Sequence, residues 1–197
     1  RKQGKIPQRR YFLIVCEGEK TEPNYFNGLK KELPKNTVNI VVKGEGRNTL
    51  NLVDYASELK RKQQEQGQVD KVWVVFDRDS FPPCDFDNAI KKAATLDFGA
   101  AWSNEAFELW YLLHFEDRKT GMNRTDYETK LTKHLGIPYR KNDEKMYARL
   151  KEKFSVAYQR AKNLDIYHQQ AQSIPHKSNP CTQVYKLVEA LQGLRSP

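Results

Sequence analysis

The strongest constraint on the fold is a series of short apolar runs that alternate with amphipathic segments over the first hundred residues. A continuous apolar run of this length is typical of a strand that is covered on both faces, as in a parallel sheet. The runs lie at 11–16, 39–42, 72–76 and 99–102, with the sequences YFLIVC, NIVV, VWVVF and a weaker GAAW. Since the segments between them have helical periodicity, the sequence predicts an α/β fold with a mainly parallel four-stranded sheet flanked by helices.

Helix-start signals support this alternation. Thr21 is expected to cap a helix that carries Glu22 and Pro23 in its first turn, and Asp85 is expected to cap the helix after the third run. Beyond residue 102 the pattern is helical, with helices predicted over about 104–116, 125–135, 143–165 and 180–194. The last of these is expected to start with Asn179 as its cap and Pro180 in its first turn.

The chain is therefore divided into a basic tail (1–10), an α/β domain (11–116) and a helical C-terminal part packed on it (117–197). Its 34 Lys and Arg exceed its 25 Asp and Glu and give a net charge of +9, which favours nucleic acid as the partner. The alternative is that the excess charge only keeps the chain soluble.

Cysteine content and hydropathy exclude several other classes. The cysteines, Cys16, Cys84 and Cys181, are widely spaced, which supports neither a disulfide framework nor a structural zinc site. No apolar run is long enough to cross a membrane, and the N-terminal residues lack the apolar core of a signal peptide, so we expect a cytoplasmic protein. The sequence leaves the oligomeric state open.

Acidic residues follow two of the predicted strands. Glu17 comes directly after the first apolar run, and Asp77 and Asp79 follow the third. Because the carboxyl ends of parallel strands share one crevice, we expect these carboxylates to converge there. Close carboxylates repel one another unless a cation neutralises them, and oxygen ligands suit Mg²⁺ or Mn²⁺. Such a metal activates water and phosphoryl groups, although acidic residues also end strands as ordinary turn residues.

Four blocks of sequence carry a resemblance to a known family: IVCEGEKTEPNYF, VVFDRDSF, SNEAFELWYLLHF and NPCTQVYKLVEAL. Together they resemble the RloB family, and the acidic pattern resembles the Toprim domain of topoisomerases, primases and OLD-type nucleases. The resemblance implies that Glu17 is a metal ligand or general base and that Asp77 and Asp79 bind the metal. It also implies a link to restriction and phage-defence loci, often near an AAA-type ATPase.

Further candidates lie outside this acidic core. Lys20 is expected either to contact the scissile phosphate or to be an ordinary exposed lysine. Glu108 is expected either to complete the metal site or to pair with a basic residue on a packed helix. His176 and Lys177 precede the last predicted helix, where positive charge and free N–H groups favour phosphate. The four histidines show no metal-binding spacing. The segment Gly44–Arg47 lacks a nucleotide-binding motif and predicts a turn, so we expect no ATP binding by this chain.

The acidic pattern and the resemblance together predict a Mg²⁺- or Mn²⁺-dependent nuclease, and the resemblance implies that it acts in anti-phage defence together with an ATPase on another chain. The sequence does not distinguish a DNA target from an RNA target such as tRNA, because contacts to the backbone carry no base identity. The alternative is a non-catalytic subunit that binds nucleic acid or regulates the complex and uses the fold as a scaffold.

Overall fold

The computed structural model describes residues 10–35, 37–42, 49–65, 69–78 and 82–194. It contains a five-stranded sheet in the order β2-β1-β3-β4-β5. The first four strands are parallel, and β5 pairs with β4 in the antiparallel direction. Their bounds are β1 Phe12–Cys16, β2 Val38–Val42, β3 Lys71–Asp77, β4 Gly99–Asn104 and β5 Cys181–Thr182. The predicted parallel four-stranded sheet is confirmed, and one short strand is added at its edge.

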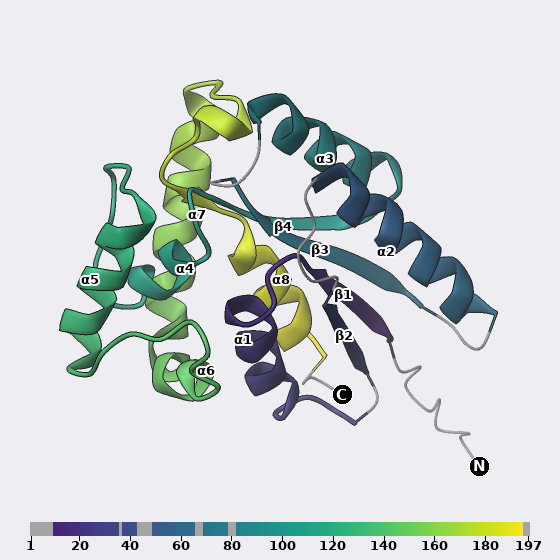
Figure 1. Cartoon of the computed structure of the whole chain (residues 1–197), viewed down its shortest axis with the longest axis horizontal. Helices are drawn as coiled ribbons and strands as arrows, with labels where there is room; N and C mark the ends of the chain where they lie inside the picture. The colour runs from purple at the N-terminus through teal and green to yellow at the C-terminus, as the bar shows by residue number, and fades with distance from the viewer. Residues whose placement is uncertain (1–9, 36, 43–48, 66–68, 79–81, 195–197) are drawn as a thin grey trace, which may run out of the picture.

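The helices surround this sheet in three groups (Figure 1). One face is covered by α2 and α3 and the other by α1 and α8, while α4 to α7 gather beside the sheet. The bounds are α1 Thr21–Lys30, α2 Thr49–Gln64, α3 Pro83–Thr95, α4 Glu108–Leu113, α5 Arg124–Leu135, α6 Met146–Leu150, α7 Phe154–Gln170 and α8 Val184–Gln192, with 3₁₀ turns η1 Lys151–Lys153 and η2 Pro175–Lys177. In the described part of the chain, no helix combines the length and the apolar character that crossing a membrane requires.

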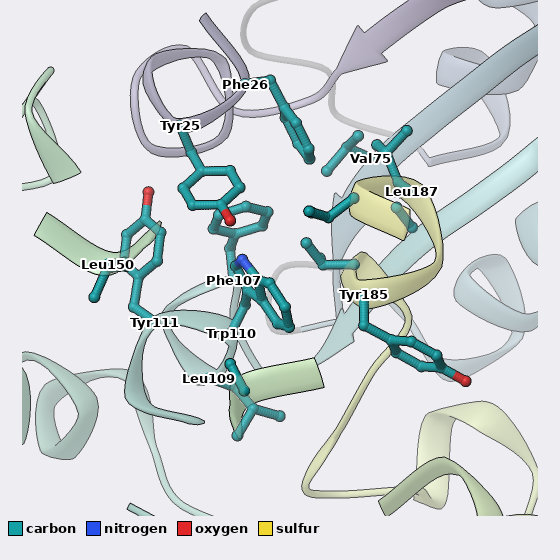
Figure 2. Close-up of a cluster of buried hydrophobic side chains, with 14 of the residues drawn as sticks. Tyr25, Phe26, Val75, Phe107, Leu109, Trp110, Tyr111, Leu150, Tyr185 and Leu187 are labelled. Atoms are coloured by element: carbon teal, nitrogen blue, oxygen red, sulfur yellow. The ribbon is translucent and has the colours of Figure 1, made fainter. Parts of the chain in front are cut away.

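Two apolar cores lie on the two faces of the sheet. Alternate residues of β1 point to opposite faces, so Ile14 joins the core beneath α1 while Val15 joins the core beneath α2 and α3. Figure 2 shows the first of these cores, in which rings from α1 and α4 point toward one another beside apolar side chains of β3 and α8. The Tyr25 ring lies edge-on to Phe107 and Trp110, with centroid distances of 5.9 and 6.4 Å. This packing fixes α1 and α4 relative to each other.

Several predicted helix bounds are wrong for identifiable reasons. Strand β4 continues to Asn104, so the helix predicted over 104–116 is only α4. The helix predicted from 180 begins at Val184, because Cys181 pairs with Asn104 as strand β5 and Pro180 therefore precedes a strand. The predicted 143–165 helix is divided by η1 into α6, which packs on α1, and α7, which packs on α4.

The predicted cap residues also differ from those observed. Thr21 is the first residue of α1, and Lys20 occupies the cap position without a side-chain hydrogen bond. Helix α3 begins at Pro83, two residues before Asp85. The predicted Gly44–Arg47 turn and most of the basic tail lie outside the described residues. Because β5 and α8 belong to the sheet and its core, the C-terminal part is built into the α/β layer rather than only packed against it.

Candidate functional site

A cavity of about 530 Å³ lies at the carboxyl end of the parallel strands, where this class of fold places its ligands. It collects acidic and basic side chains from the β1–α1 connection, the end of β3, the start of α4, the start of α5 and the α5–α6 connection. The lining residues are Gly18, Glu19, Lys20, Thr21, Glu22, Asp77, Glu108, Arg124 and Lys141. The cavity therefore holds Asp77, Lys20 and Glu108 of the residues that the sequence predicted for the site.

Asp77 ends β3 and is only 8% exposed. Its Oδ2 accepts a hydrogen bond from Nη2 of Arg124 at 3.3 Å. Arg124 is the first residue of α5, which Asn123 caps by accepting the backbone N–H of Asp126 at 2.9 Å. A cation in the first turn of a helix opposes the helix dipole. The position of Arg124 is therefore explained by the carboxylate that it meets in the cavity.

Glu22 is the second carboxylate of the cavity and is 5% exposed. It lies in the first turn of α1, one turn before the buried Phe26 and therefore on the helix face that packs inward. Its carboxylate packs directly against Gly18. Burial, together with the charge of Glu108, raises the pKa of Glu22 from 4.5 to about 7, although backbone hydrogen bonds and Arg124 act in the opposite direction. Glu22 therefore exchanges a proton near neutral pH.

Glu108 is the third carboxylate, at the start of α4, and is 2% exposed. Its Oε1 accepts a hydrogen bond from the Tyr139 hydroxyl at 3.0 Å. In the next turn of α4, the Tyr111 hydroxyl donates to the Thr21 carbonyl at 3.1 Å. This bond ties the helix of Glu108 to the first turn of α1. Glu22 and Glu108 thus lie on two helices, α1 and α4, that this hydrogen bond connects.

The predicted convergence of the Glu17 and Asp77 side chains stays a prediction, although the backbones of the two residues lie near each other. The Glu17 N–H donates to the Val75 carbonyl at 3.0 Å, so its backbone lies within about 8 Å of Asp77, given the usual spacing of paired strands. Asp77 and Val75 lie two residues apart on β3 and so face the same side of the sheet, whereas Glu17 follows the last residue of β1. Of the described residues, Glu22 rather than Glu17 lines the cavity beside Asp77. Asp79 lies outside the described residues.

The chemistry of these donors fits a hard divalent cation. Glu22, Asp77 and Glu108 offer only oxygen atoms, which suit Mg²⁺ or Mn²⁺, and burial makes their negative charges costly without a cation. Within the described ranges, no group of three or more His, Cys, Asp or Glu side chains is already arranged to hold a metal.

His176 and Lys177 do not line the cavity. The His176 ring donates from Nδ1 to Oδ2 of Asp87 at 2.6 Å, and its backbone N–H donates to the other carboxylate oxygen at 3.0 Å. Asn104 also donates from Nδ2 to the His176 carbonyl at 3.0 Å. These bonds hold η2 against α3 and the end of β4. The predicted phosphate role of His176 and Lys177 stays a prediction.

The remaining histidines take part in packing and hydrogen bonds. His114 and His168 are buried and bond to the carbonyls of Trp110 and Pro180 at 2.8 and 3.0 Å. His134 stacks on Phe115 and lies 2.9 Å from a carboxylate oxygen of Glu116.

Several residues of the cavity or its wall were missed from the sequence, among them Glu22, Arg124, Tyr139 and Lys141. For Glu22 a signal was present, because it precedes Tyr25, Phe26 and Leu29 by three, four and seven residues and so lies on the apolar face of its helix. An acidic residue on a buried face indicates a functional or paired carboxylate. Arg124, Tyr139 and Lys141 have no comparable local signal.

The comparisons with known proteins identify the family of the chain. The family model described as RloB-like protein matches residues 12–191, nearly the whole chain. No protein with a curated function matches the sequence. The matched range contains every residue of the cavity and all five strands. The chain therefore belongs to the RloB-like protein family.

Proposed function

We propose that this protein is a Mg²⁺- or Mn²⁺-dependent nuclease that hydrolyses phosphodiester bonds at the cavity described above. One observation carries the proposal: the buried carboxylates Glu22, Asp77 and Glu108 share a cavity with the basic residues Lys20 and Arg124. Carboxylates suit the metal, and the basic side chains suit the phosphate that a nuclease must hold next to it. A purely structural acid cluster has no need of an open cavity.

Each residue has a role in this proposal. Asp77, Glu22 and Glu108 hold the metal, which, when bound, polarises a phosphoryl oxygen and lowers the pKa of a bound water. Lys20 and Arg124 bind the non-bridging phosphate oxygens and stabilise the negative charge that develops during attack. Arg124 also neutralises Asp77 while no substrate is present, through the 3.3 Å contact. Glu17 and Asp79 remain ligand candidates that rest on the family resemblance.

The substrate is proposed to be a nucleic acid, DNA or RNA, in keeping with the net charge of +9. Both tRNA and DNA should be tested as substrates, because lysine and arginine contacts to phosphate do not distinguish between them. Following the resemblance, we propose that the protein acts in anti-phage defence together with an AAA-type ATPase on a separate chain. The assay must therefore include that partner.

The test is cleavage of tRNA, single-stranded DNA and duplex DNA by the purified chain with its ATPase partner, in Mg²⁺, Mn²⁺ or EDTA. We expect metal-dependent cleavage by the wild type and none by Asp77→Asn, which keeps the side-chain shape but loses the charge. Asp117→Asn, at an exposed position away from this cavity, is the matched control. Equal cleavage by wild type and Asp77→Asn contradicts the assignment. Binding of nucleic acid without cleavage by any form supports the scaffold alternative.

A further inference from the structure

The connection between α5 and α6, residues 137–145, turns back from α5 toward the cavity. Helix α5 is capped at its C-terminus by Gly136, whose φ of 68° is left-handed and whose N–H donates to the Thr132 carbonyl at 3.1 Å. Three residues later, the backbone N–H of Tyr139 donates to Oγ1 of the same threonine at 3.0 Å. These two bonds fix the direction in which this α5–α6 loop leaves its helix.

Tyr139 brings the loop into contact with the carboxylate cluster. Its hydroxyl donates to Oε1 of Glu108 at 3.0 Å, and its ring lies 6.4 Å from the ring of Tyr111. Burial and the charge of Glu108 raise the pKa of Tyr139, so the hydroxyl keeps its proton and acts as the donor. One oxygen of Glu108 is thereby occupied. Glu108 also lines the cavity, so a ligand there can reach its carboxylate.

Lys141 is the second residue that the loop contributes, and it lines the cavity. Its Nζ lies 3.4 Å from Oε1 of Glu128, but the two side chains are 44% and 41% exposed. An ion pair this exposed is weak, because water and salt screen it. Lys141 can therefore leave its ion pair with Glu128 and bind a more highly charged group that enters the cavity.

We propose that the α5–α6 loop forms the substrate-side wall of the site, in which Tyr139 positions Glu108 for the metal and Lys141 binds a backbone phosphate of the nucleic acid. This inference rests on the proposed function and adds two residues to it. Tyr139 and Lys141 both lie outside the acidic segments that follow β1 and end β3. Tyr139 is a positioning residue, whereas Lys141 contacts the substrate directly.

The role of Tyr139 is tested by Mn²⁺ binding to the metal-free protein, followed by electron paramagnetic resonance without any substrate. Loss of a hydrogen bond that orients a ligand typically weakens metal binding by about 10- to 100-fold, and we expect this for Tyr139→Phe. Tyr167→Phe, at an exposed tyrosine of α7, should bind like the wild type. Thr132→Val removes only the anchor of the loop and should give a smaller loss. Equal Mn²⁺ affinity of Tyr139→Phe and wild type overturns the positioning role.

The role of Lys141 is tested by the binding of a fluorescein-labelled 20-nucleotide oligothymidine, with Ca²⁺ in place of Mg²⁺, over a range of salt concentrations. Loss of one phosphate contact on a single strand should reduce the slope of log K against log salt by about 0.7. Lys141→Ala should show this reduction and Lys141→Arg should not.

Two controls separate this role from a structural one. Glu128→Gln removes the ion pair but keeps the lysine, and Lys145→Ala removes an exposed lysine of the same loop. Both should keep the wild-type slope. An unchanged slope in Lys141→Ala, or an equal reduction in Glu128→Gln, overturns the phosphate contact. Since neither measurement requires cleavage, wild-type protein that binds Mn²⁺ and oligothymidine but cuts nothing contradicts only the proposed nuclease function.

Discussion

Glu22→Gln gives a quantitative test of the buried carboxylate cluster. In the folded protein the pKa of Glu22 is about 7, whereas its ordinary value is 4.5, chiefly because burial disfavours the charged form. Folding therefore favours the protonated form. The stability that this contributes is fully present below pH 4.5 and is lost as the pH rises to about 7. At about 1.4 kcal/mol per pH unit, the difference amounts to about 3 kcal/mol.

Glutamine has nearly the same shape as glutamate but carries no charge at any pH. Between pH 4.5 and pH 8, the wild type should therefore lose about 3 kcal/mol of unfolding free energy relative to Glu22→Gln, which for a chain of this size corresponds to about 6–12 °C in Tm. The measurement is urea unfolding in EDTA at several pH values, followed by circular dichroism. Glu144→Gln, an exposed position in the α5–α6 loop, is the control and should parallel the wild type.

Saturating Mg²⁺ at pH 8 should reduce the difference in unfolding free energy between the wild type and Glu22→Gln. The reason is that an ion that binds only the folded, ionised cluster stabilises the wild type more than the variant. Parallel pH profiles for wild type and Glu22→Gln in EDTA would refute the reasoning. So would a wild type that gains stability relative to the variant as the pH rises, since the sign of the shift would then be reversed.

Three further predictions concern neighbouring features. In Gly18→Ala the new Cβ would lie 2.6 Å from Oε1 of Glu22, so the carboxylate must move, and cleavage should fall about 100-fold with little change in Tm. Wild-type circular dichroism with undiminished cleavage would contradict this. In Arg124→Ala, the affinity for oligothymidine should fall about tenfold, and Arg124→Lys should be intermediate because lysine lacks the planar fork of donors. Equal affinities of Arg124→Ala and the wild type would exclude a phosphate contact. Trp110→Ala should lower the unfolding free energy by about 3–5 kcal/mol in urea at pH 5, because the ring is fully buried in the core shown in Figure 2. A loss below about 1 kcal/mol would show that the core tolerates the space left by the missing ring.

The parallel sheet was predictable from sequence because buried strands require continuous apolar runs. YFLIVC and VWVVF contain β1 and most of β3, and Glu17 and Asp77, which follow these runs, reach the same edge of the sheet. The start of the last helix was not predictable from Asn179 and Pro180, because the pairing of Cys181 with β4 overrides a local helix signal. Such pairing depends on residues far away in the sequence.

The candidate site was predictable only in part, for the same physical reason. Asp77 ends β3 and Lys20 lies in the short connection after β1, so their place at the sheet edge was evident from the order of elements. Glu22 could have been found from its position on the apolar face of α1. Arg124 and Tyr139 reach the cavity only because α5 and its loop pack beside α4, and no local pattern encodes that packing.

The most direct test of the central claim is a crystal structure of the protein soaked in Mn²⁺, with the metal located by its anomalous scattering. We predict a peak in the cavity, about 2.0–2.3 Å from a carboxylate oxygen of Asp77 and from an oxygen of Glu22 or Glu108. The absence of a peak in the cavity, at Mn²⁺ concentrations that support cleavage, would contradict the claim that this acidic cluster is a metal site.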